Sequence, residues 1–172
     1  MVIGEFKKFA KAIQAYYPKQ EYFKDNESLM LWYEELKDIP YPVASIALRK
    51  HVRSSKYPVT IADIIDNAVS TQKNDNSWSD GWESVLTAIR RYGYMQEKEA
   101  LQSLDEITRT AVKRLNWQML CTAQLDELTA IRANFRMIYN EINEKETNNA
   151  KLSNELRQAI EQVKNNMKAL EG

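Results

Sequence analysis

Apolar residues recur every three or four positions along most of the chain, which is the spacing of amphipathic α-helices. The first helix is predicted over Glu5–Tyr17 and ends at Pro18, and a second begins near Asn26 and ends at Ile39–Pro40. A third helix begins at Pro42, because proline suits the first turn of a helix. The residues predicted to face the core are Phe6, Phe9, Ala10, Ile13, Tyr17, Leu29, Trp32, Tyr33, Leu36, Val43, Ile46, Ala47 and His51.

Residues 56–65 contain the clearest helix start in the chain. Thr60 suits the N-cap position, and Asp63 can return a hydrogen bond to it in a capping box. Val59 and Ile64 have the spacing of a hydrophobic staple, which fixes the direction in which the chain enters the helix. The pattern therefore predicts a fourth helix, which completes a small bundle.

The chain is predicted to be all-α and to have four parts. Residues 1–70 form a small N-terminal helical bundle, and residues 71–80 form a polar linker. Residues 81–142 form a second helical segment that ends in a long helix. Residues 143–172 form a tail with a heptad-like pattern, which is helical or partly disordered.

The second segment opens with a predicted capping box between Asp80 and Glu83, and Gly93 suits the end of that helix. Neither glycine nor proline occurs between Gly93 and Gly172, so helix after helix is expected there. The long helix begins near Leu125. Its predicted apolar stripe consists of Leu125, Leu128, Ile131, Phe135, Ile138 and Ile142.

The tail carries an apolar seam of about two heptads. The seam residues are Leu156, Ile160, Val163, Met167 and Leu170. Two heptads are fewer than a convincing coiled coil needs, and an isolated helix of this length is marginal in water. The tail is therefore expected to become ordered through self-association over residues 150–172 or through a partner, with a disordered polar tail as the alternative.

Composition narrows the function classes. The 172 residues include 24 Lys and Arg and 24 Asp and Glu, so the net charge is zero and gives no global attraction to nucleic acid or acidic lipid. One cysteine, Cys121, and one histidine, His51, cannot build a disulfide framework or a zinc site. A reducing, cytoplasmic setting is expected, because neither a signal peptide nor a membrane-spanning apolar run is present.

No catalytic motif is present. The sequence lacks both the P-loop and the dinucleotide-binding pattern, and no metal or other cofactor is expected. A nucleophile–histidine pair would have to use His51, which is expected to be a capping or surface residue near the end of the third helix. Cys121 is expected to be a small core residue. The chain is therefore expected not to be an enzyme.

Two sets of residues are candidates for binding a partner. The first set alternates arginine with aromatic and apolar residues, the types favoured as interface anchors. It comprises Arg90, Arg91, Arg132, Phe135, Arg136 and Tyr139. The alternative is that Phe135 belongs to the core while the arginines of the last helix are solvated or pair locally with Asp126, Glu127 or Glu141.

The second set is the basic corner between the third and fourth helices. It comprises Arg49, Lys50, Arg53 and Lys56. Two short helices joined by a turn next to basic residues could form a DNA-binding helix-turn-helix. Asp63 and Asp66 on the fourth helix would oppose phosphates, so a solvated basic edge is the preferred interpretation and direct nucleic-acid binding is not expected.

Residues 1–70 resemble the phage replicative-helicase loader/inhibitor family. The resemblance rests on Lys-Ala-Ile…Tyr-Tyr-Pro in the first helix, Leu-x-x-Trp-Tyr-x-x-Leu in the second, and the turn Lys-Tyr-Pro-x-Thr-Ile-Ala-Asp-Ile-Ile. Residues 80–142, with Ala-Ile-Arg-Arg-Tyr-Gly-Tyr and Arg-Ala-Asn-Phe-Arg-Met-Ile-Tyr, look like the C-terminal half of longer phage relatives.

The resemblance implies a non-enzymatic adaptor in the cytoplasm of the host cell. Such proteins bind the hexameric, DnaB-type replicative helicase, hold it inactive and deliver it to an origin-bound replisome organiser. In that family the N-terminal helical domain is ordered, and a flexible C-terminal segment contacts the helicase. This chain departs from that pattern because residues 80–142 are expected to be folded.

Overall fold

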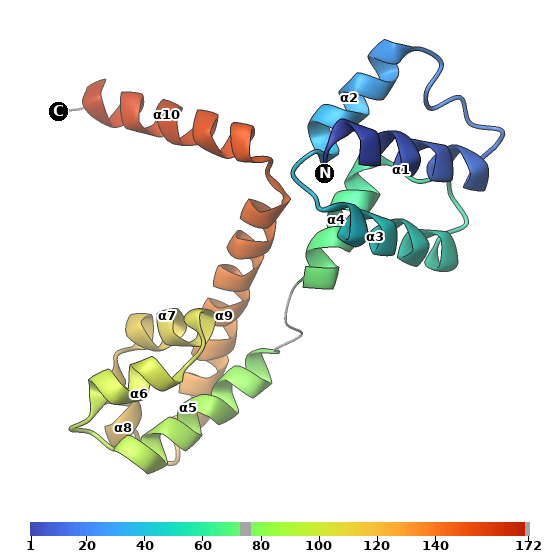
Figure 1. Cartoon of the computed structure of the whole chain (residues 1–172). Helices are drawn as coiled ribbons and strands as arrows, with labels where there is room; N and C mark the ends of the chain where they lie inside the picture. The colour runs from blue at the N-terminus through green and yellow to red at the C-terminus, as the bar shows by residue number, and fades with distance from the viewer. Residues whose placement is uncertain (73–76, 171–172) are drawn as a thin grey trace. The chain divides into compact units, whose positions relative to one another are not determined.

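The computed structural model describes residues 1–72 and 77–170, with side chains up to Met167. These residues form ten α-helices and no strand, which confirms the all-α prediction (Figure 1). The helices are α1 (Ile3–Tyr16), α2 (Asn26–Leu36), α3 (Tyr41–Ser54), α4 (Ile61–Gln72), α5 (Trp78–Tyr92), α6 (Glu97–Ser103), α7 (Glu106–Leu115), α8 (Trp117–Thr122), α9 (Leu128–Lys151) and α10 (Asn154–Leu170). They belong to two compact units. Unit 1 comprises Met1–Lys73 with Asn149–Gly172, and unit 2 comprises Asn74–Asn148.

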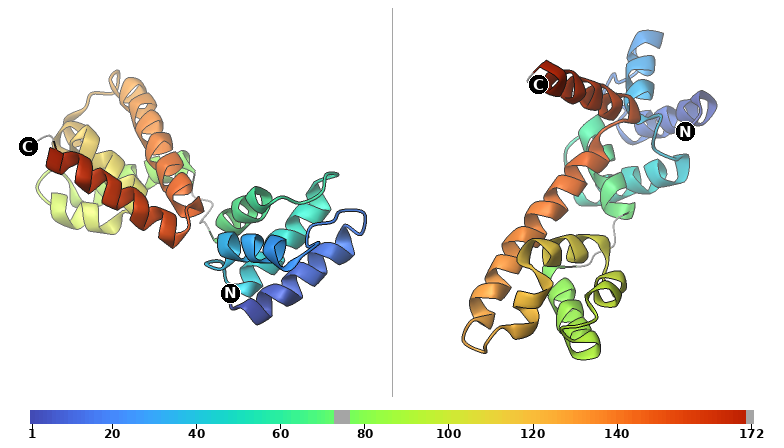
Figure 2. Two further views of the ribbon diagram at one scale, coloured as in Figure 1. Left: turned by 90° about the horizontal axis from the view of Figure 1, so that it is seen from above. Right: turned by 90° about the vertical axis from the view of Figure 1, so that its left-hand side faces the viewer.

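Helices α1 to α4 form the bundle of unit 1 (Figure 2). Its buried residues are Phe6, Phe9, Ala10, Ile13, Leu36, Ala44, Ala47, Leu48, Val59, Ile64 and Ala68. An aromatic layer lies beside them, in which the rings of Phe6 and Tyr33 are 5.5 Å apart and those of Tyr22 and Trp32 are 5.2 Å apart. One predicted core residue is wrong, because the Ile46 side chain is half exposed.

The capping box that opens α4 is confirmed. The backbone N–H of Thr60 donates to Asp63 Oδ2 at 2.8 Å, and the N–H of Asp63 donates to Thr60 Oγ1 at 3.2 Å. The predicted staple residues Val59 and Ile64 are both buried. His51 is buried as well, which corrects the expectation of a surface histidine: its Nε2 lies 3.1 Å from the Tyr57 carbonyl oxygen beneath this turn.

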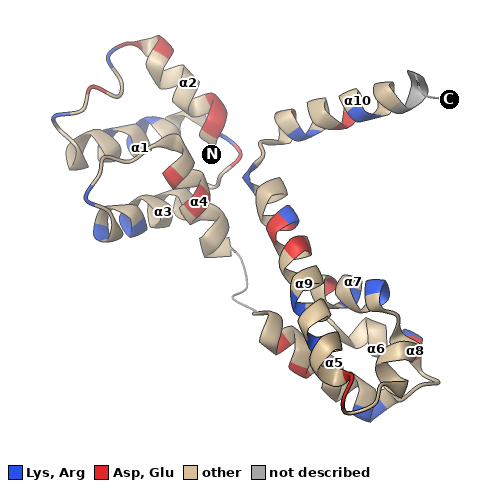
Figure 3. Ribbon diagram, turned by 180° about the vertical axis from the view of Figure 1, so that it is seen from behind, with Lys and Arg blue, Asp and Glu red and all other residues tan. Residues whose placement is uncertain are grey.

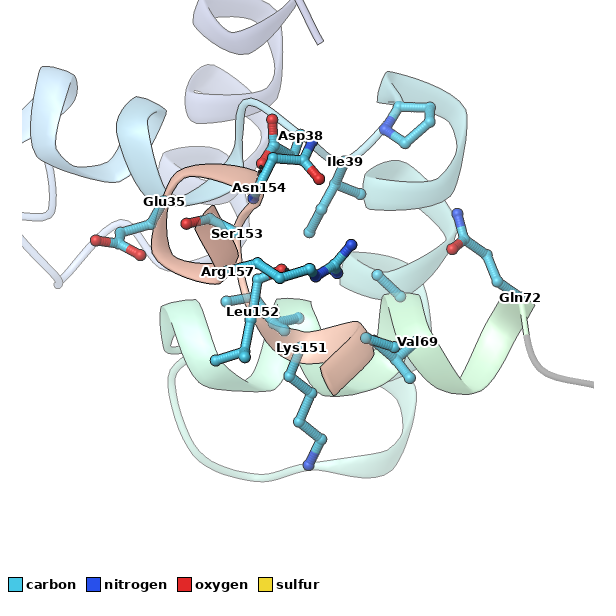
Figure 4. Close-up of a pocket in the computed structure, with 14 residues that line it drawn as sticks. Glu35, Asp38, Ile39, Val69, Gln72, Lys151, Leu152, Ser153, Asn154 and Arg157 are labelled. Atoms are coloured by element: carbon cyan, nitrogen blue, oxygen red, sulfur yellow. Dashed lines mark hydrogen bonds between the residues drawn. The ribbon is translucent and has the colours of Figure 1, made fainter. Parts of the chain in front are cut away.

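The connection between α9 and α10 packs on the bundle within unit 1 (Figure 4). The N–H of Asn154 donates to Asp38 Oδ2 at 2.8 Å, and Lys151 pairs with Asp66 at 2.9 Å. A pocket of about 160 Å³ lies at this contact, and Ile39, Val69 and Leu152 are among its lining residues. We call residues 149–157 the elbow.

Two further side chains fix the elbow. Lys37 Nζ bridges Glu34 and Glu155, at 2.6 Å from each, and the hydrogen bond to Glu155 is the main cause that raises the pKa of Lys37. Arg157 Nη2 donates to the carbonyl oxygens of Asn149 and Leu152, so it satisfies acceptors at the C-terminal end of α9.

Helices α5 to α8 and most of α9 enclose the core of unit 2. Its buried residues are Trp82, Val85, Ala88, Ala100, Leu104, Ala111, Val112, Trp117, Leu120, Ile131, Phe135, Tyr139 and Ile142. Gly93 ends α5 with a positive φ of 63°, as predicted. Helix α5 begins three residues before the predicted start, because Ser77 caps it and Asp80 closes the capping box.

The structure also moves two predicted boundaries. Helix α4 runs to Gln72 and α5 begins at Trp78, so both ends of the expected 71–80 linker are helical, while residues 73–76 lie outside the described residues. The polar stretch after Ile142 continues α9 to Lys151, and α10 follows as a separate helix. The exposed side chains of Leu156, Val163 and Met167 lie on α10.

Gly81 packs more closely than a side chain would permit. A Cβ atom there would lie 2.8 Å from Thr108 Oγ1 and 2.9 Å from Tyr139 Cε2. Glycine to alanine inside a helix ordinarily stabilises by up to about 1 kcal/mol. We expect the reverse for Gly81→Ala, a loss of about 1–3 kcal/mol through overpacking.

Gly4→Ala is the matched control for this change, because Gly4 is also helical and no atom lies within 4 Å of a Cβ there. Urea unfolding of both variants, followed by tryptophan fluorescence, measures the two effects. Equal stability of Gly81→Ala and the parent chain would contradict the close packing of α5.

The Thr60–Asp63 capping box predicts a pH dependence. The hydrogen bond from Thr60 is the main cause that lowers the pKa of Asp63, and the nearby His51 lowers it further. A lowered carboxyl pKa contributes stability above the unfolded pKa of about 3.9, and this contribution is lost as the pH falls through the folded value.

Asp63→Asn should therefore cost about 1 kcal/mol at pH 7, and the difference from the parent chain should shrink below about pH 4. Urea unfolding at pH 7 and pH 3 tests this. A difference that stays the same at both pH values would show that the carboxylate charge of Asp63 is not the stabilising group.

Candidate partner-binding surface

The structure does not bring the two predicted arginine pairs into one site. Arg90 and Arg91 lie in the last turn of α5, whereas Arg132 and Arg136 lie on α9 beside Trp78, the first residue of α5. Twelve residues separate Trp78 from Arg90, which is about 18 Å along a helix axis. The pairs are therefore separate features of unit 2.

Trp78 joins Arg132 and Arg136 into one cluster. The guanidinium carbons of Arg132 and Arg136 lie 5.3 Å and 5.1 Å from the centre of the indole ring. Both distances are within the range of cation–π attraction, which is worth about 0.5–1 kcal/mol at an exposed site. The ring therefore restricts two side chains that would otherwise move freely in solvent.

The cluster lines an open groove with a volume of about 390 Å³, which we call the Trp78 groove. Its lining residues are Trp78, Thr129, Arg132, Ala133, Arg136, Met137 and Asn140. Met137 is 70 % exposed, which leaves a flexible apolar side chain next to the two cations. Arginine, tryptophan and methionine are all enriched at protein interfaces.

The two guanidinium groups of the Trp78 groove have no carboxylate partner among the residues that the structure describes. Local pairing was one interpretation of the sequence, and the structure excludes it for Glu141. This carboxylate pairs with Lys145 at 2.5 Å and lies 3.5 Å from Arg114, and the contact with Lys145 is the main cause that lowers its pKa. Both cations of the groove are thus available to an external anion.

Phe135 and Tyr139 are not surface anchors, which corrects that part of the candidate set. Their side chains are 0 % and 1 % exposed. The Phe135 ring packs 5.3 Å from the ring of Trp82, and burial raises the pKa of the Tyr139 hydroxyl. Both residues continue the apolar stripe of α9, so neither can contact a partner while unit 2 stays folded.

The sequence missed Trp78 and Met137. Trp78 stands among serine, asparagine and aspartate, and this polar composition indicated a linker. The signal that could have found it is the capping box between Ser77 and Asp80, which makes Trp78 the first residue of a helix. Met137 lies next to Arg136 but outside the apolar stripe, and that position already marks it as exposed.

Arg91 has a different environment. Its guanidinium lies 5.2 Å from the centre of the Tyr92 ring. It also lines a depression with Glu83, whose carboxylate supplies negative charge there. This surface lacks the two uncompensated cations of the Trp78 groove.

The basic corner of unit 1 is exposed at Arg49, Lys50, Arg53 and Lys56. Six residues, 55–60, connect α3 to α4, which is longer than the usual three- or four-residue turn of a helix-turn-helix. Figure 3 shows basic residues on α3 and acidic residues on α4. Because α4 contains no lysine or arginine, the helix that would read DNA carries only negative charge.

The described residues contain no group of three or more His, Cys, Asp and Glu side chains that could hold a metal ion. Cys121 is partly buried, and this burial raises the pKa of its thiol, which disfavours the reactive thiolate. No helix in the described part of the chain is long and apolar enough to cross a membrane.

Comparison with protein families gives a match for the N-terminal bundle. Residues 1–65 match the family model for the N-terminal domain of the phage helicase loader/inhibitor. Residues 1–65 therefore form a loader/inhibitor N-terminal domain. The match confirms the predicted resemblance over α1 to α3 and the first turns of α4, including the Thr60 capping box. No curated protein and no solved structure matches the chain.

The opposite roles of Phe135 and Met137 on α9 can be measured. Phe135→Ala removes a fully buried ring and should lower the free energy of unfolding of unit 2 by about 3–5 kcal/mol. Met137→Ala, two residues further on, should change it by less than about 0.5 kcal/mol. Thermal unfolding by circular dichroism compares the two, and a Phe135→Ala variant as stable as Met137→Ala would restore Phe135 as a surface residue.

Proposed function

We propose that this protein is a phage DNA-replication adaptor. It binds the hexameric replicative helicase, restrains it and helps to deliver it to the origin-bound replisome organiser. The observation that carries the proposal is the match of residues 1–65 to the N-terminal domain of a phage helicase loader/inhibitor. The adaptor acts by binding and not by catalysis, in the cytoplasm of the host cell.

Two surfaces support the adaptor role. The loader/inhibitor domain in unit 1 supplies one, and the Trp78 groove in unit 2 supplies another. We assign helicase binding to the Trp78 groove, because the C-terminal segment has that role in the family and unit 2 is the folded part of that segment here. The loader/inhibitor domain then remains for the replisome organiser.

Self-association is a further part of the proposal. Leu156, Val163 and Met167 leave the seam of α10 exposed, at 49 %, 57 % and 57 % of their surface. A second copy that binds through residues 150–172 would bury this seam.

The proposal predicts that the full chain co-purifies with the replicative helicase of the host, with ATP, without ATP or in both conditions. Arg132→Glu with Arg136→Glu should reduce the captured helicase at least tenfold, because two cations become anions on the binding surface. Arg90→Glu with Arg91→Glu is the matched control, since it makes the same charge change elsewhere in unit 2 and should leave capture unchanged.

The outcomes separate the candidate functions. Capture that is equally sensitive to both arginine pairs would support the adaptor but remove the Trp78 groove as its helicase contact. No capture in either nucleotide condition would refute helicase binding. It would favour the alternative function, a DNA-binding replication or regulatory protein that uses Arg49, Lys50, Arg53 and Lys56, whose exposure is the observation in its favour.

A further inference from the structure

The Trp78 groove has a chemistry that selects its ligand. Arg132 and Arg136 are one turn apart on α9, so their charges are separated by about 6 Å along the helix. Both groups lie over the Trp78 ring, which reduces the conformational freedom that each loses when a ligand binds. A guanidinium over a ring still directs N–H donors sideways, where a carboxylate can accept two of them.

We propose that the Trp78 groove binds an acidic segment of a protein partner, with two carboxylates against Arg132 and Arg136 and one apolar side chain against Met137. The carboxylate spacing fits residues i and i+4 of a helix, or residues i and i+2 of an extended strand, since both spacings are about 6–7 Å. The inference rests on the proposed function only for the identity of the protein that carries the segment.

Charge distribution favours a short acidic peptide over a nucleic acid. Residues 77–148 contain nine Lys and Arg and eleven Asp and Glu, so unit 2 as a whole carries net negative charge. A nucleic-acid backbone extends beyond two phosphates and would meet this negative surface. A peptide with two carboxylates and an apolar residue meets only the two cations and Met137.

The groove also sets the strength of binding. It has seven lining residues, fewer than the twenty to thirty on each side of a standard stable interface. A single acidic segment should therefore bind weakly and dissociate readily. Each charge-assisted hydrogen bond contributes on the order of 1.5 kcal/mol, or about tenfold in affinity.

The test uses the full chain labelled with ¹⁵N and a synthetic helical peptide that carries two glutamates at i and i+4 beside a leucine. A matched peptide has glutamine in place of both glutamates. The indole N–H signal of Trp78, identified by its loss in Trp78→Phe, should shift with the glutamate peptide and not with the glutamine peptide. Arg132→Glu with Arg136→Glu should weaken the glutamate peptide at least tenfold, and Arg90→Glu with Arg91→Glu should not.

Three results would overturn the proposal. These are no Trp78 shift with the glutamate peptide at millimolar concentration, equal shifts with both peptides, and a larger shift with a single-stranded oligodeoxythymidine of twenty nucleotides. Each of them leaves the adaptor function standing if the full chain still captures the helicase. Conversely, glutamate-dependent shifts without helicase capture would keep the groove chemistry and remove the proposed function.

Discussion

Because Gly81 has no side chain, α5 can pack directly against Thr108 and Tyr139, with less than 3 Å available for a Cβ. This close approach places the Trp82 ring next to Phe135 in the core of unit 2. Trp78 lies one helical turn before Trp82, so the same packing places its ring beside the solvent-facing side of α9. The cluster with Arg132 and Arg136 is thus a consequence of core packing, and the surface is held by the part of unit 2 that resists change most strongly.

Much of the fold follows from local rules that depend on a few neighbouring residues. The Thr60 box, the Val59–Ile64 staple and the Gly93 helix end all have this property, and each was predicted from the sequence. The start of α5 could not be decided in this way. Ser77 with Asp80 and Asp80 with Glu83 both fit a capping box, and only the burial of Trp82 and Val85 in the assembled core selects the first pair.

The candidate site was predicted less completely than the fold, for a physical reason. Helical spacing tells which residues share a face, but a partner surface depends on which other element covers that face. Arg132 and Arg136 were predicted as binding residues, and the structure leaves them available. Phe135 was predicted with them because of its residue type, although its place in the apolar stripe indicated the core. Trp78 could be assigned to the site only after α5 and α9 were placed together.

The elbow differs in energy from both cores. Its ion pairs, between Lys37 and Glu155 and between Lys151 and Asp66, involve exposed or half-exposed side chains. Such pairs contribute about 0–1 kcal/mol each, far less than a buried aromatic side chain. The attachment of residues 149–157 to the bundle is therefore the weakest contact in unit 1. An adaptor that holds its partner through several small surfaces gains affinity from their linkage in one chain, yet each surface can dissociate alone. Weak contacts at the elbow and the small Trp78 groove thus favour release of a partner after delivery.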